Sequence, residues 1–120
     1  MHRILVADDD QDDLELIEHV LRAPDRTLRQ VTSGAEMVQA IADEEPFDVI
    51  VSDVMMPWMN GLSVALTAQR SGLPSRFIFV TGHESAALAA LVSRLHDVRL
   101  LSKPVPVDEL RAAVDAALGG

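Results

Sequence analysis

The sequence of 120 residues is long enough for one domain, expected to span residues 1–120, with a single apolar core and no stabilising disulfide. It contains no cysteine, which excludes disulfide frameworks, thiol catalysis and zinc–thiolate sites and fits a reducing, cytoplasmic location. The formal net charge of −9 argues against direct binding to nucleic acid or anionic membranes, and no stretch approaches the roughly 18 apolar residues of a membrane span.

Strand-like apolar runs recur along the chain. They are short, rich in Val, Ile and Leu, and bounded by polar residues. In chain order they cover residues 4–7, 27–31, 49–51, 77–80 and 100–101. The second run alternates with polar residues, which is typical of a sheet edge, and the third is the most continuous, which is typical of a sheet centre.

A helical pattern follows each of these runs. Apolar residues at spacings of three and four predict five helices. In chain order they cover residues 14–21, 35–42, 62–69, 88–95 and 107–114. The second helix has Ser33 as its predicted N-cap and Glu36 as the capping-box partner, whereas Pro57, Asn60 and Gly61 predict a loop before the third.

Strict alternation of five strands and five helices predicts an α/β fold, because parallel strands need long crossover connections and these are expected to be right-handed. The economical arrangement is a doubly wound, five-stranded parallel sheet of the flavodoxin-like type, with strand order 2-1-3-4-5. Spacing alone does not fix that order.

Polar residues follow four of the predicted strands. They are Asp8 and Asp9 after the first, Asp53 after the third, Thr81 after the fourth and Lys103 after the fifth. The carboxyl ends of parallel strands lie along one edge, so these groups converge on one crevice. Clustered carboxylates repel one another unless a cation is present, and oxygen-only ligands suit Mg²⁺. A carboxylate beside Mg²⁺, a lysine and a hydroxyl suits phosphoryl transfer, with Asp53 as the nucleophile.

Five acidic residues crowd the start of the first helix: Asp8, Asp9, Asp10, Asp12 and Asp13. Carboxylates are favoured at a helix N-terminus by the helix dipole, so an ordinary acidic helix start explains this run. A cation site explains it equally well, and the run by itself does not separate the two interpretations.

Four segments in this order resemble the receiver domain of response regulators, the phosphoacceptor proteins of two-component signalling. The resemblance covers nearly the whole chain. The matching segments are residues 4–10 (ILVADDD), residues 48–62 (DVIVSDVMMPWMNGL), Thr81 with Gly82, and Lys103 with Pro104.

The resemblance implies a role for each strand-end residue. Asp53 is implied to accept a phosphoryl group from a histidine kinase or histidine phosphotransfer protein, and Thr81 and Lys103 to contact that group. The bond between Lys103 and Pro104 is implied to be cis. The implied Mg²⁺ ligands are Asp8, Asp9, Asp53 and the backbone carbonyl of Met55.

By the same resemblance, the chain is a signalling switch that catalyses only its own phosphorylation and dephosphorylation. It is implied to act on a downstream effector protein, with a homodimer possible through the face formed by the fourth helix, fifth strand and fifth helix. Leu100 stands where the family often has an aromatic residue, which motivates the alternative of an interaction module with phosphorylation-independent output. A magnesium-dependent phosphatase is disfavoured, since such enzymes place a second Asp where this chain has Met55.

Overall fold

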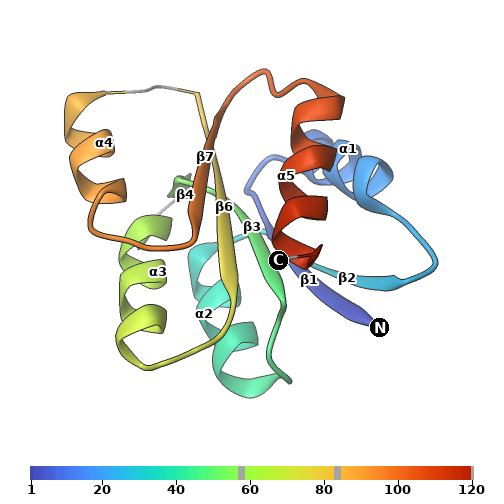
Figure 1. Cartoon of the computed structure of the whole chain (residues 1–120), viewed down its shortest axis with the longest axis horizontal. Helices are drawn as coiled ribbons and strands as arrows, with labels where there is room; N and C mark the ends of the chain where they lie inside the picture. Colours follow the sequence, from blue (N-terminus) through green and yellow to red (C-terminus); the bar gives the residue numbers. More distant parts are fainter. Residues whose placement is uncertain (57–58, 83–84, 120) are drawn as a thin grey trace.

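The computed structural model describes residues 1–56, 59–82 and 85–119, without the side chains of residues 55, 56 and 59–61. Its main sheet has five parallel strands in the order β2-β1-β3-β6-β7 (Figure 1). These strands are β1 (His2–Ala7), β2 (Arg26–Val31), β3 (Val49–Asp53), β6 (Arg76–Thr81) and β7 (Val98–Ser102). They are the five predicted strands in the predicted order, so the doubly wound fold is confirmed.

Two further strands, β4 (Met55–Met56) and β5 (Met59–Asn60), pair antiparallel after β3. The sequence did not predict them, because two-residue strands are too short to show a period. The predicted loop is therefore wrong at Asn60, which lies in β5, and at Gly61, which begins the third helix. Pro57 lies outside the described residues.

Five helices alternate with the strands of the main sheet in the described part of the chain. They are α1 (Gln11–Leu21), α2 (Gly34–Asp43), α3 (Gly61–Arg70), α4 (Ala86–Val92) and α5 (Val107–Gly119). None of them is both long and apolar enough to cross a membrane. Ser33 is confirmed as the N-cap of α2, because its Oγ accepts a hydrogen bond from the Glu36 N–H at 3.1 Å. The reciprocal bond of a capping box differs from the prediction: the Glu36 carboxylate accepts from the Thr32 N–H at 3.4 Å and from the Ser33 hydroxyl at 3.2 Å.

Helix α4 is shorter than the sequence predicts. It ends at Val92, and the chain then turns through Asp97, which adopts a positive φ of 57°. Leu95, predicted to lie on the helix, lies in this turn and packs against the core. Leu91 does lie on the helix, but its side chain is 42% exposed. A backbone hydrogen bond from the Leu95 N–H to the Val92 carbonyl at 3.0 Å closes the turn.

The core has two halves, one on each face of the sheet. Successive residues of a strand point to opposite faces, so Leu5 and Ala7 of β1 pack on one side and Ile4 and Val6 on the other. The first side is covered by α2, α3 and α4, and the second by α1 and α5 (Figure 1). Burial on both faces explains why β3 is a continuous apolar run up to Ser52.

Candidate functional site at the carboxyl edge of the sheet

The ends of β1 and β3 bring two carboxylates together. These strands are hydrogen-bonded neighbours, with Ala7 opposite Ser52, so the residues that follow, Asp8 and Asp53, are adjacent. Asp8 is held by two backbone contacts: its N–H donates to the Val31 carbonyl at 3.2 Å, and its Oδ1 accepts from the Asp10 N–H at 2.9 Å. Its side chain is 1% exposed. The sheet itself therefore places a buried carboxylate beside Asp53.

A third carboxylate completes an acidic cluster. One oxygen from each of Asp8, Asp9 and Asp53 lies within 4.8 Å of the others. Asp8 is buried, Asp53 is partly buried and Asp9 is exposed, so the cluster opens to solvent on one side. Oxygen ligands in a pocket that admits water fit Mg²⁺, which takes one or two carboxylates and retains several waters. The backbone of Met55 lies two residues beyond Asp53, in β4.

Lys103 brings the compensating positive charge. Its Nζ lies 3.2 Å from Asp53 Oδ2, 3.1 Å from Asp13 Oδ2 and 3.5 Å from Asp8 Oδ2. Its backbone N–H donates to the Thr81 carbonyl at 2.7 Å, which ties the end of β7 to the end of β6. The peptide bond between Lys103 and Pro104 is cis, as the resemblance implied.

Burial and charge shift two pKa values in this pocket. Burial raises the pKa of Asp8 to about 6, and the charges of Asp53 and Asp13 add to the rise, while the Asp10 N–H and the Lys103 ammonium oppose it. Burial lowers the pKa of Lys103, but hydrogen bonds to Asp13 and Asp53 and the nearby carboxylates outweigh burial and raise it above its ordinary value. The ammonium therefore stays charged, and an ionised Asp8 is costly without a further cation.

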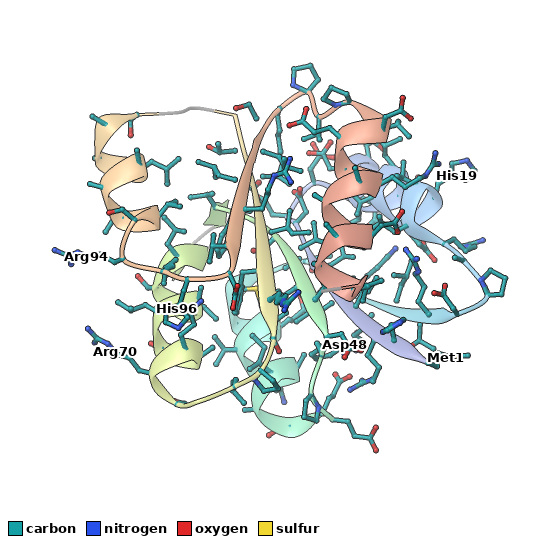
Figure 2. The ribbon with its side chains drawn as sticks, in the orientation of Figure 1. Met1, His19, Asp48, Arg70, Arg94 and His96 are labelled. Carbon is teal, nitrogen blue, oxygen red and sulfur yellow. The ribbon has the colours of Figure 1, made fainter. Side chains whose placement is uncertain are left out.

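The structure brings the predicted site residues to one edge of the sheet. Thr81 is buried at the end of β6, the strand next to β3, and is joined to Lys103 through the backbone. Asp48, in contrast, precedes β3 and lies near Met1 at the opposite end of the sheet (Figure 2). Its carboxylate accepts a hydrogen bond from the Arg3 N–H at 2.7 Å, so it belongs to the scaffold.

The acidic residues at the start of α1 are divided between the helix start and the pocket. The helix-start interpretation is confirmed for Asp10, and the cation-site interpretation of Asp8 and Asp9 stays a prediction. Asp10 is the N-cap of α1 and accepts hydrogen bonds from the N–H groups of Asp12 and Asp13. Asp8 and Asp9 belong to the pocket, and Asp12 is exposed on the first turn. The sequence did not single out the contact of Asp13 with Lys103, although α1 begins at the same edge of the sheet.

The fold and the site define a doubly wound α/β protein with a pocket at the carboxyl edge of its sheet, in which a lysine lies beside the carboxylates of Asp8, Asp9, Asp13 and Asp53. A family model described as the response regulator receiver domain matches residues 4–115. The chain therefore belongs to the receiver domains of response regulators. Members of this family are signalling modules of two-component systems and not conventional enzymes.

Individual relatives agree with this membership. The response regulator receiver protein CpdR of Brucella abortus (strain 2308) is 29% identical over 118 residues, which cover 98% of each chain. The DNA-binding transcriptional regulator NtrC of Escherichia coli (strain K12) is 30% identical over 96% of this chain, which spans only 24% of NtrC. The receiver domain of the Francisella response regulator 1452 superimposes with a TM-score of 0.86 at 25% identity, covering 99% of this chain and 98% of that one.

Proposed function

We propose that residues 1–120 form one phosphoacceptor domain in which Asp53 receives a phosphoryl group from a phosphohistidine on a histidine kinase or phosphotransfer protein. The observation that carries the proposal is the position of Asp53. Its carboxylate lies at the end of the central strand, 3.2 Å from the Lys103 ammonium and beside the oxygens of Asp8 and Asp9.

The proposed reaction is a single displacement at phosphorus. A carboxylate oxygen of Asp53 forms a bond to phosphorus as the phosphorus–nitrogen bond of the donor breaks, and the donor imidazole keeps the electron pair of that bond. The product is an acyl phosphate on Asp53. Attack of water on the same phosphorus breaks its bond to the Asp53 oxygen, restores the carboxylate and releases inorganic phosphate.

The acidic cluster fits a magnesium site. Asp8, Asp9, Asp53 and the backbone carbonyl of Met55 are the groups that would hold Mg²⁺, because all are oxygen ligands and one side of the cluster is open to water. When bound, the cation neutralises charge on the transferring phosphoryl oxygens. It would also offset the unfavourable ionisation of buried Asp8.

Lys103 and Thr81 are proposed to engage the phosphoryl group after transfer. The Lys103 ammonium already touches Asp53 and carries the positive charge that phosphoryl oxygens require. Thr81, on the neighbouring strand, supplies a hydroxyl that can donate a hydrogen bond. The Lys103 N–H donates to the Thr81 carbonyl at 2.7 Å, and we propose that this bond couples the movement of the two residues.

The signal is proposed to leave the pocket as a shift between two conformations. The phosphoryl group can move that equilibrium only by the difference in its interaction with the two states. We propose a cytoplasmic location, a downstream effector protein as the receiver of the signal, and a homodimer through α4, β7 and α5 as one possible arrangement. Direct binding to nucleic acid or membrane is not part of the proposal, given the net charge of −9.

The test of the proposal is incubation with Mg²⁺ and acetyl phosphate, followed by intact-mass measurement. The proposal expects one phosphoryl adduct on the wild-type protein and none on Asp53→Asn, which keeps the shape of the side chain but removes the nucleophile. Asp48→Asn is the matched control, because Asp48 lies at the far end of the sheet, and it should form the adduct like wild type. Absence of the wild-type adduct, or its persistence in Asp53→Asn, would refute the proposal.

Leu100 favours a second candidate, an interaction module whose output does not depend on phosphorylation. Leu100 lies in β7, is partly buried, and packs against the half of the core that α2, α3 and α4 cover. Unlike the aromatic residue common at this position, Leu100 has no ring that could move between a buried and an exposed position. Amide hydrogen exchange with and without the phosphoryl group separates the candidates: unchanged exchange across α4, β7 and α5 supports the second, and a large change there rejects it.

A further inference from the structure

Asp13 makes a contact that the phosphoryl-transfer chemistry does not require. It lies in the first turn of α1, and its Oδ2 is 3.1 Å from the Lys103 Nζ, the shortest of the three Lys103–carboxylate distances. The Lys103 side chain is 28% exposed and the Asp13 side chain is 37% exposed, so the pair is partly exposed to solvent. Lys103 is therefore bound to α1 as well as to the acceptor carboxylate.

Two of the three ammonium protons are engaged in hydrogen bonds, to Asp13 Oδ2 at 3.1 Å and to Asp53 Oδ2 at 3.2 Å, and Asp8 adds an ion pair at 3.5 Å. A lysine ammonium has three donors, and three carboxylate oxygens lie within 3.5 Å of it in the described structure. A phosphoryl oxygen on Asp53 that draws the ammonium toward itself would therefore compete with the hydrogen bond to Asp13.

The surroundings of Lys103 leave room for it to change partners. A cavity of about 120 Å³ between α1 and the start of α5 is lined by Asp13, Lys103 and Pro104, together with apolar side chains such as Ile17 and Val105. The apolar lining strengthens charge interactions at its rim, since the local dielectric is low. The contact between Asp13 and Lys103 is thus neither packed rigidly nor fully solvated.

We propose that Asp13 is a positioning residue that holds the Lys103 ammonium on the α1 side of the pocket and thereby slows phosphoryl transfer to Asp53. The proposal rests on the proposed function for its kinetic consequence. Its structural part, the hold on Lys103, does not depend on phosphorylation.

The kinetic test uses the full chain with Mg²⁺ and acetyl phosphate. Asp13→Asn keeps the size of the side chain but removes its charge and so weakens its hold on the ammonium; it should raise the rate constant of adduct formation about 3- to 10-fold, as expected when one competing charge-assisted hydrogen bond to Lys103 is weakened. Asp13→Glu, which retains the charge, should stay within about twofold of wild type. Asp12→Asn is the matched control: it makes the same change one residue away, on an exposed side chain. A rate for Asp13→Asn equal to that of Asp12→Asn, or lower, overturns the kinetic part.

A second variant background shows whether Asp13 acts through Lys103. In Lys103→Met, the acceleration caused by Asp13→Asn should fall below about twofold, because the ammonium that Asp13 positions is gone. An undiminished acceleration in that background would mean that Asp13 acts only through its charge, and it would overturn the positioning role.

The structural part has its own readout, because Lys103 is the only lysine in the sequence. In protein labelled with ¹⁵N-lysine, a single side-chain ammonium signal therefore reports this residue. Asp13→Asn should shift that signal and speed its proton exchange with water, whereas Asp12→Asn should leave it unchanged. A wild-type ammonium that exchanges like free lysine, or an Asp13→Asn spectrum identical to wild type, overturns the proposal. If the wild-type protein formed no phosphoryl adduct, the proposed function would fail while this measurement still decided the role of Asp13.

Discussion

Asp8→Asn should stabilise the protein in the absence of divalent cations. Asp8 is 1% exposed, and burial raises its pKa to about 6 from an ordinary value of 3.8. The ionised carboxylate therefore destabilises the folded state at neutral pH. Asparagine removes the charge but keeps the oxygen that accepts a hydrogen bond from the Asp10 N–H.

The size of the effect follows from that pKa. A rise of about two in a carboxyl pKa corresponds to about 3 kcal/mol between the two protonation states. The interaction of Asp8 with Lys103 is already contained in the raised pKa, so we expect Asp8→Asn to increase the free energy of unfolding by about 1–3 kcal/mol at pH 7.5.

The pH dependence tests independently whether the charge of Asp8 destabilises the folded state. The pKa of Asp8 is about 6 in the folded state and 3.8 as an ordinary value. Between these pH values the folded state binds more protons than the unfolded state, so its stability rises as the pH falls. The advantage of Asp8→Asn should therefore shrink by about 1–1.5 kcal/mol between pH 7.5 and pH 5.

Urea denaturation in EDTA, followed by circular dichroism at both pH values, measures these differences. Asp9→Asn is the matched control, since Asp9 belongs to the same cluster but is exposed, and its effect should stay within about 0.5 kcal/mol. A destabilised Asp8→Asn protein, or an advantage that grows toward pH 5, would contradict the electrostatic reasoning.

Three further predictions follow from the same structure. Affinity for Mg²⁺, measured by calorimetry, should fall as the pH drops through about 6, because protonation of Asp8 competes with the cation. An affinity that does not change between pH 7.5 and pH 5.5 would argue against Asp8 as a ligand. Ser33→Ala should lower the free energy of unfolding by about 1 kcal/mol through loss of the α2 N-cap, with Ser71→Ala, at an exposed position, as comparison. Phe79→Ala should cost about 3–5 kcal/mol in the same assay, since Phe79 is fully buried and stacks on Phe77; a loss below 1 kcal/mol would be inconsistent with this packing.

The sequence predicted the fold and the position of the site residues because both depend on simple periodic features. Apolar runs of strand length, separated by helical spacing, indicated the alternating α/β arrangement. Once the sheet is parallel, the residues that follow each strand must share one edge, so Asp8, Asp53 and Lys103 could be grouped from the sequence alone.

Features that depend on tertiary contact could not be predicted. The Asp13–Lys103 contact joins residues 90 positions apart and depends on where α1 sits relative to the end of β7. The end of α4 at Val92 depends on a turn in which the His96 N–H donates to the Gln69 side chain on α3 at 3.3 Å. Neither contact leaves a local pattern in the sequence.

Chemical trapping of the phosphoryl group tests whether Asp53 is the acceptor in this acidic pocket. After incubation with acetyl phosphate, borohydride reduces an aspartyl phosphate to homoserine, which peptide mass spectrometry locates in the sequence. We predict homoserine at position 53, formed with Mg²⁺ and absent with EDTA. Homoserine at another aspartate, or equal labelling without a divalent cation, would contradict the proposed site.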